Sequence, residues 1–192
     1  MTTVPQNPPS PAADRPLRSM LFVSGEKPGR FAKALASGAD LACIDLEDAV
    51  HPARKEEARR AVFAFAAGHR HVAGQARIAI RLNGLRTREG LADIAALVAS
   101  GASVDYLLLP KVEHADDLGL VHAWAGDSFD GLVALIETPA GIERAAAIAA
   151  TVRGDAPKLK ALMLGGADLS VELGSAFDWN GLLHARGRLV NA

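Results

Sequence analysis

The sequence predicts an α/β fold built on a parallel sheet, and three observations carry that prediction. Short apolar runs alternate with longer alanine-rich stretches from Leu17 onward. The runs lack the strict alternation of a half-exposed strand, which is typical of strands covered on both faces. Successive runs begin roughly 22 to 37 residues apart, which is the spacing of repeated βα units.

The predicted strands are six apolar runs. They are LRSMLFVS (17–24), DLACIDL (40–46), ARIAIRL (76–82), VDYLLLP (104–110), GLVALIE (131–137) and LKALMLG (159–165). Between them, three stretches predict helices by their ends, because proline near the start and glycine just past the end usually limit a helix. They are RFAKALASG (30–38), HPARKEEARRAVFAFAAG (51–68) and TPAGIERAAAIAATVRG (138–154).

Six βα units fit two architectures, a doubly wound open sheet and a (β/α)8 barrel, and periodicity does not separate them.

Composition limits the class of protein. The 192 residues are 49% hydrophobic, which predicts one globular domain with a substantial core over residues 17–192. The formal net charge of −1 gives no indication of the basic surface typical of nucleic-acid binding or of a polybasic membrane patch, so we expect small molecules or other subunits as partners. The single cysteine, Cys43, allows no disulfide within the chain.

The first sixteen residues contain five prolines and almost no large apolar side chain, so we expect a disordered tail over residues 1–16. The sequence shows no signal peptide and no apolar stretch long enough to cross a bilayer. We therefore expect a cytoplasmic protein that does not bind membranes.

Polar side chains collect where the predicted strands end. In chain order they are Glu47 and Asp48, Arg81 and Asn83, Lys111, Glu137, and Asp168. Taken singly, each has a structural explanation, such as a helix cap, an ion pair or a turn. Taken together they predict a ligand site, because parallel βα folds bind ligands at the carboxyl ends of their strands.

The residue types indicate the chemistry of this site. Glu137 and Asp168 come from separate strands with no clustered Cys or His, an all-oxygen set that suits Mg²⁺. Glu47 and Asp48 are placed to accept hydrogen bonds from metal-bound water. Arg81 offers a planar fork of donors that matches a substrate carboxylate.

Five motifs, in this order, carry a resemblance to a known family. They are LFVSGEKPGRFAKALASGADLACIDLEDAV, IRLNG, LPKVE, IETPAGI and GGADLSVELG. Over residues 17 to 190 or so the chain resembles the citrate lyase β-subunit-like family, within the HpcH/HpaI aldolase group. The resemblance implies a (β/α)8 barrel of the TIM type, here truncated to about six βα units. It also implies a carbon–carbon lyase that cleaves or forms a 3-hydroxyacyl-CoA such as citryl-CoA or malyl-CoA, with oxaloacetate or glyoxylate and acetyl-CoA as the other side of the reaction.

The same resemblance assigns roles to residues. It implies that Glu137 and Asp168 are the Mg²⁺ ligands, that Arg81 binds the substrate carboxylate, and that Glu47 and Asp48 lie near the metal-bound water. We also expect Lys111 and Glu137 to contact the substrate. The general base for the hydroxyl proton stays open between Glu47, Asp48 and water.

The chain departs from the family pattern at its carboxyl end. Family members run on through two more βα units, whereas this sequence stops within what should be the sixth helix. An open barrel leaves its first and sixth strands unpaired, so we expect a homo-oligomer, by resemblance a trimer, that covers the exposed flank. Two other functions fit the residues: a Mg²⁺-dependent aldolase acting on 4-hydroxy-2-oxo acids, and a non-catalytic truncated paralogue that serves as a binding subunit.

Overall fold

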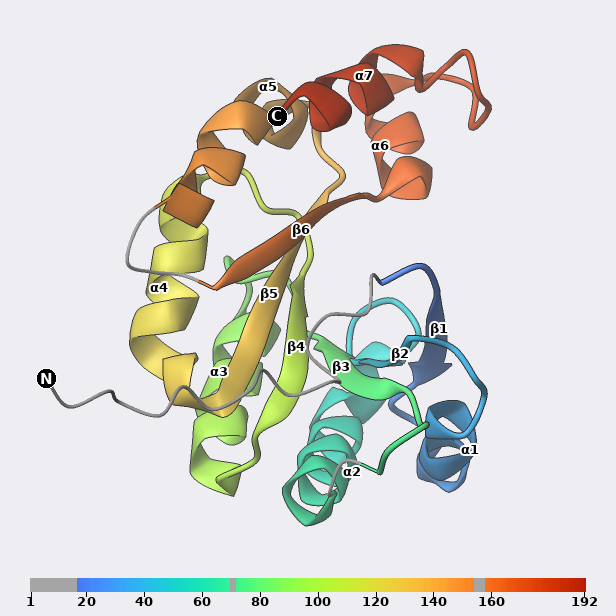
Figure 1. The fold of residues 1–192 in the computed structure, drawn as a ribbon, viewed down its shortest axis with the longest axis vertical. Helices are drawn as coiled ribbons and strands as arrows, with labels where there is room; N and C mark the ends of the chain where they lie inside the picture. The colour runs from blue at the N-terminus through green and yellow to red at the C-terminus, as the bar shows by residue number, and fades with distance from the viewer. Residues whose placement is uncertain (1–16, 70–71, 154–157) are drawn as a thin grey trace, which may run out of the picture.

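Figure 1 shows the computed structural model, which describes residues 17–69, 72–153 and 158–192. The predicted tail, residues 1–16, lies outside these ranges. All six predicted strands are present: β1 (Met20–Ser24), β2 (Leu41–Asp45), β3 (Arg77–Arg81), β4 (Val104–Leu109), β5 (Phe129–Ile136) and β6 (Leu159–Leu164). The helices are α1 (Phe31–Leu35), α2 (Lys55–Gly68), α3 (Arg88–Ser100), α4 (Ala115–Ala125), α5 (Pro139–Ala149), α6 (Gly166–Leu173) and α7 (Leu183–Asn191).

The predicted helices differ from the observed ones mainly at their ends. The segment that starts at His51 first forms a short 3₁₀ turn, Pro52–Arg54, and then continues as α2 to Gly68. The segment from Thr138 forms α5 and a 3₁₀ turn, and its predicted last residue, Gly154, lies outside the described ranges. The stretch after β6 forms two helices, because Gly174 adopts φ +61° and ends α6.

The sheet decides between the two architectures. Its strands run in the order β1-β2-β3-β4-β5-β6, and every neighbouring pair is parallel. A doubly wound sheet would reverse its strand order at a switch point, and this sheet does not. The sequential order is that of a barrel of repeated βα units, so the barrel-type prediction is confirmed.

Two apolar cores follow from this arrangement. The larger one lies between the sheet and the helices, where α2, α3, α4 and α5 contact one another in chain order (Figure 1). The smaller one lies on the other face of the sheet and contains Cys43, Ala79, Leu108 and Val133. These four side chains are the interior layer of the barrel, because Cys43 pairs with Ala79 and Leu108 pairs with Val133 across adjacent strands.

The sheet is open, as the sequence predicts. β1 and β6 are its first and last strands, and neither pairs with the other. Leu21 and Phe22 on β1 consequently leave 42% and 41% of their surface exposed. The oligomer expected to cover this flank stays a prediction, and so does the cytoplasmic location. Within the described ranges, no helix combines the length and the apolar character needed to cross a membrane.

Candidate functional site

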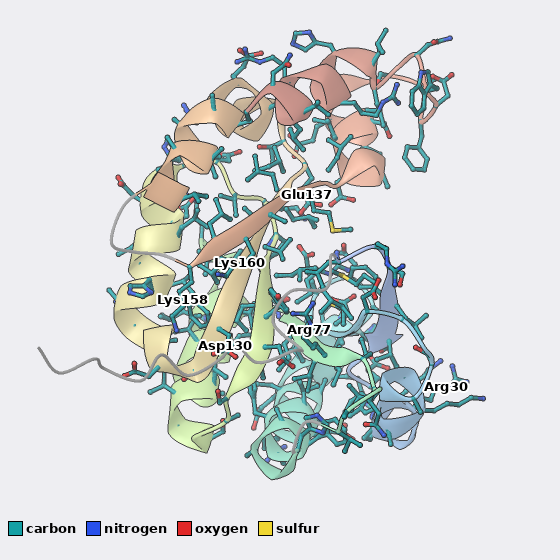
Figure 2. All side chains as sticks on the ribbon, in the orientation of Figure 1. Arg30, Arg77, Asp130, Glu137, Lys158 and Lys160 are labelled. Atoms are coloured by element: carbon teal, nitrogen blue, oxygen red, sulfur yellow. The ribbon has the colours of Figure 1, made fainter. Side chains whose placement is uncertain are left out.

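Lys111 lies at the centre of the polar residues that follow the strands. Its Nζ atom is 3.0 Å from Glu47 Oε1, 3.0 Å from Asp168 Oδ2 and 3.8 Å from Glu137 Oε1. These carboxylates come from the ends of β2, β5 and β6, so the predicted convergence of strand ends at one edge of the sheet does occur. Figure 2 shows Glu137 beyond the carboxyl end of β5, beside the turn from β6 into α6.

The backbone of Lys111 is unusual as well. Its φ of +54° is left-handed, a conformation that residues other than glycine rarely adopt and that stores strain. In this conformation its N–H donates to Glu137 Oε1 at 3.0 Å. Burial alone would lower the pKa of the Lys111 ammonium, but hydrogen bonds to Glu47 and Asp168 outweigh it and raise the pKa.

Glu137 is a buried carboxylate with 3% of its surface exposed. Burial removes its hydration, and the nearby Glu47 adds like charge, so the pKa of Glu137 rises to about 7 despite the Lys111 ammonium. Gly165 makes room for this side chain, because a Cβ atom at that position would overlap Glu137 Oε2. The Gly165 N–H also donates to the Ile136 carbonyl at 3.0 Å, which ties the two strand ends together.

Arg81 does not present a free fork to the site. Its Nε and Nη2 atoms donate to Asp45 Oδ1 and Oδ2 at 2.7 and 2.6 Å, a bidentate pair between directly opposed residues of β2 and β3. The remaining nitrogen, Nη1, lies 3.0 Å from Glu47 Oε2 and 3.5 Å from Asp48 Oδ2. The Nε–Nη2 edge of Arg81 is therefore not available as a fork for a substrate carboxylate, and the predicted substrate contact stays a prediction.

Asp45 belongs to this site, although the sequence analysis gave it no role there. Besides pairing with Arg81, it accepts the backbone N–H groups of Glu47 and Ala49 at 2.8 and 3.1 Å. Both carboxylate oxygens of Asp45, at the end of β2, therefore accept two hydrogen bonds each, and these bonds hold the loop that carries Glu47 and Asp48. The sequence could have revealed this pair by position, since Asp45 and Arg81 are the last residues of adjacent parallel strands.

Glu47 and Asp48 have different surroundings. Glu47 is buried, whereas the Asp48 side chain is 60% exposed at the rim. Burial raises the pKa of Glu47, although the Lys111 hydrogen bond and the Arg81 charge oppose the rise. Glu47 Oε2 is close to Arg81 but accepts no hydrogen bond from any described residue. A buried oxygen of this kind has room for one more donor.

A second set of polar contacts lies behind the loop. Lys55, at the start of α2, donates to the carbonyls of Leu46 and Glu47 at 2.7 and 2.6 Å and to Asn83 Oδ1 at 2.6 Å. Asn83 Nδ2 donates in turn to Asp93 Oδ2 at 2.7 Å, on α3. Of Lys55, Asn83 and Asp93, only Asn83 was singled out from the sequence.

A divalent cation fits the Glu137 and Asp168 pair. The Lys111 ammonium is within 4 Å of both carboxylates, so the space between them already accepts positive charge. In the part of the chain that the structure describes, no three Asp, Glu, His or Cys side chains form a ready-made metal cluster. Mg²⁺ does not require one, because it commonly takes one or two carboxylates and completes its shell with water and substrate.

Open space adjoins this cluster. The residues that line a cavity of about 240 Å³ include Gly84, Arg86, Lys111, Thr138 and Glu172. It lies among the loops after β3, β4 and β5, where a ligand reaching Lys111 would have room.

Residues 18–192 match the model of the HpcH/HpaI aldolase/citrate lyase family. The chain belongs to this family. The predicted resemblance is thereby confirmed.

Relatives of known name support the same family. The chain is 36% identical over 178 residues to the L-malyl-CoA/beta-methylmalyl-CoA lyase of Rhodobacter capsulatus, covering 88% of this chain and 54% of that protein. It is 39% identical over 166 residues to the (3S)-malyl-CoA thioesterase of Cereibacter sphaeroides, covering 84% and 53%. The chain thus spans about half the length of the curated relatives it matches.

Solved structures share the fold. RipC from Yersinia pestis superposes with a TM-score of 0.75 at 37% identity, covering 91% of this chain and 69% of that one. A citrate lyase beta subunit from M. tuberculosis, complexed with oxaloacetate and magnesium, superposes with a TM-score of 0.69 at 29% identity, covering 88% and 70%.

Proposed function

We propose that this protein is a Mg²⁺-dependent carbon–carbon lyase that cleaves or forms a 3-hydroxyacyl-CoA thioester of the malyl-CoA or citryl-CoA type. The observation that carries the proposal is the cluster of Glu47, Glu137 and Asp168 around the Lys111 ammonium at the carboxyl edge of the sheet. Support comes from the relatives, which include a malyl-CoA lyase and a citrate lyase beta subunit complexed with oxaloacetate and magnesium.

Glu137 and Asp168 are the residues that would hold the magnesium ion. When bound, the ion supplies Lewis-acid stabilisation for negative charge that develops on the oxygens of the keto-acid half. Glu137 is held in place by the Lys111 N–H, while the half-exposed Asp168 faces the solvent side of the site. The Lys111 ammonium and Arg81 Nη1 supply positive charge for a substrate carboxylate.

Glu47 is the general base of this proposal. Cleavage of the carbon–carbon bond requires removal of the hydroxyl proton while the electron pair of that bond passes to the thioester enolate. Glu47 is buried beside Lys111, and its Oε2 atom, 3.0 Å from Arg81 Nη1, accepts no hydrogen bond within the described residues, so Oε2 is the oxygen that would receive the proton. Asp48 is further out and exposed, which makes it the weaker candidate.

The test is to incubate the purified protein with malyl-CoA or citryl-CoA, with and without Mg²⁺, and to follow the keto acid as its phenylhydrazone. We expect Mg²⁺-dependent release of glyoxylate or oxaloacetate, and a loss of at least about a hundredfold in Glu137→Gln. Glu143→Gln is the matched control, since this glutamate lies exposed on α5 and pairs only with His184 and Arg188 among the described residues.

Two results would count against the proposal. Free CoA thiol without keto acid would indicate thioester hydrolysis, the activity named for the C. sphaeroides relative. Cleavage of a 4-hydroxy-2-oxo acid but of neither CoA thioester would indicate an aldolase.

A further inference from the structure

Lys55 makes three hydrogen bonds that end on the loop behind Glu47. Its Nζ atom donates to Leu46 O at 2.7 Å, to Glu47 O at 2.6 Å and to Asn83 Oδ1 at 2.6 Å. An ammonium group has three N–H donors, so all of them are used. Lys55 is therefore not free to act as a nucleophile or a base, although it lies close to the site.

The loop is held from both of its polar sides. Asp45 accepts the N–H groups of Glu47 and Ala49, and Lys55 donates to the carbonyls of Leu46 and Glu47. Charged partners make stronger hydrogen bonds than neutral ones, so both the donors and the acceptors of these peptides are fixed. The Cα atom that carries the Glu47 side chain therefore lies between an N–H group held by Asp45 and a carbonyl held by Lys55.

Lys55 is itself anchored to the helices. Asn83 bridges Lys55 and Asp93, donating to Asp93 Oδ2 from Nδ2 at 2.7 Å and from its backbone N–H at 2.8 Å. Asp93 is fully buried and accepts from Arg59 Nε at 2.7 Å. The chain of contacts therefore runs from α2 and α3 to the Glu47 loop without a gap.

We propose that Lys55 is a positioning residue that fixes the Leu46–Glu47 peptide and thereby holds the Glu47 carboxylate in place for proton transfer. The inference rests on the proposed function for its catalytic consequence, but the positioning itself is a statement about the loop. A structural lysine that merely stabilised the fold would act on all parts of the molecule alike. A positioning lysine acts through Glu47.

The chain offers a matched control in Lys158. Its Nζ atom also donates to two carbonyls, Gly126 O at 2.8 Å and Phe129 O at 2.6 Å. It lies at the start of β6, at the opposite end of the strands from Glu137 (Figure 2). Lys55→Met and Lys158→Met each remove a charged donor from two backbone carbonyls, but only Lys55 lies next to the Glu47 loop.

The first measurement needs no activity. Hydrogen exchange, followed by mass spectrometry on peptides covering residues 46–50, is compared between the two variants and the wild type. We expect faster exchange of this loop in Lys55→Met and unchanged exchange there in Lys158→Met. Equal protection of the loop in all three proteins would overturn the proposal.

The second measurement is a double-mutant cycle on kcat. Because small displacements of a reacting group lower rates steeply, we expect Lys55→Met to reduce kcat at least about tenfold, with KM changed less than about threefold. In a Glu47→Gln background the same substitution should cost less than about twofold, since the group that it positions is already lost. Lys158→Met should have the same small effect in both backgrounds.

If the effects of Lys55→Met and Glu47→Gln on kcat were fully additive, the proposal that Lys55 acts on catalysis through Glu47 would be overturned. A wild-type protein without lyase activity would remove the proposed function, and the exchange data would still decide whether Lys55 holds the loop.

Discussion

Gly165 lies so close to Glu137 that adding a single methyl group tests the geometry of the site. In Gly165→Ala the new Cβ would overlap Glu137 Oε2 and would lie 2.5 Å from Glu137 Cβ. Rotating the carboxylate relieves the first contact but not the second, because Cβ is fixed to the backbone. The backbone is restrained too, since Gly165 N–H donates to Ile136 O at 3.0 Å. The substitution must therefore move the end of β5 or of β6.

This crowding sets the expected size of two effects of Gly165→Ala, on stability and on Mg²⁺ binding. Inserting a methyl group into a packed region typically costs about 1–3 kcal/mol, so we expect the free energy of unfolding to fall by about 2 kcal/mol. If Glu137 binds Mg²⁺, its displacement should weaken binding at least about tenfold, which corresponds to about 1.4 kcal/mol. Urea unfolding measures the first effect, and calorimetric titration with Mg²⁺ measures the second.

Gly131→Ala is the control for overpacking alone. Its Cβ would be 2.7 Å from Lys160 Cγ and from Tyr106 Cε1, at the other end of β5 from Glu137. We expect it to lower stability without changing Mg²⁺ affinity. If Gly165→Ala binds Mg²⁺ as tightly as the wild type, or if both variants lose affinity equally, the assignment of Glu137 as a ligand held against Gly165 is refuted.

Three further perturbations test charges around the sheet. Arg81→Ala should lower the free energy of unfolding by about 3 kcal/mol in chemical denaturation, because it leaves the buried Asp45 unpaired; wild-type stability would contradict the pairing. Lys111→Met should lower Tm without metal and enlarge the rise in Tm on adding Mg²⁺, because in the proposed site its ammonium competes with the ion for Glu137 and Asp168. An unchanged rise would argue against a shared position. Hydrogen bonds from Arg18 hold the pKa of Asp40 at about 2, below its usual 3.8, so Asp40→Asn should lower Tm at pH 7. The difference in Tm between the wild type and this variant should vanish as pH falls from about 4 to about 2, because the Asp40 carboxylate becomes protonated over that range. A difference in Tm that stays constant with pH would contradict the assignment.

The fold could be predicted from the sequence because its strands are buried on both faces and its helices are bounded by proline and glycine. β2, for example, is buried at every position, so its residues could only be apolar until the strand ends at Asp45. The strand order was not predictable from periodicity, because a barrel and a doubly wound sheet repeat the same unit. It became predictable only from the family motifs.

The site residues were predictable as a set but not in their pairing. Strand ends converge in any parallel sheet, which is why Glu47, Lys111, Glu137 and Asp168 could be grouped by their positions in the chain. That Arg81 turns its Nε–Nη2 edge to Asp45 and not outward depends on side-chain register across two strands. The left-handed backbone of Lys111, which aims its N–H at Glu137, leaves no mark in a sequence of ordinary residue types.

The contacts behind the site did leave a signal. Along α3 the buried residues Gly90, Asp93, Ile94 and Leu97 follow the spacing of one helical face, so a carboxylate occupies a position on the apolar stripe. Arg59 holds the matching position on α2, together with Val62, Phe63 and Ala66.

A charge on the core face of a helix is retained only if it is paired, since burying it alone is prohibitively unfavourable. Two adjacent helices that each carry one such charge, of opposite sign, should therefore pair there, as Arg59 and Asp93 do at 2.7 Å. Neither residue touches Glu47. Through Asn83 and Lys55, however, their contacts reach the loop that carries it. In this barrel, the charged pair on the buried stripes of α2 and α3 begins a path of contacts from the helix layer to the carboxyl edge of the sheet, and the place of both residues on their stripes follows from the amino-acid spacing alone.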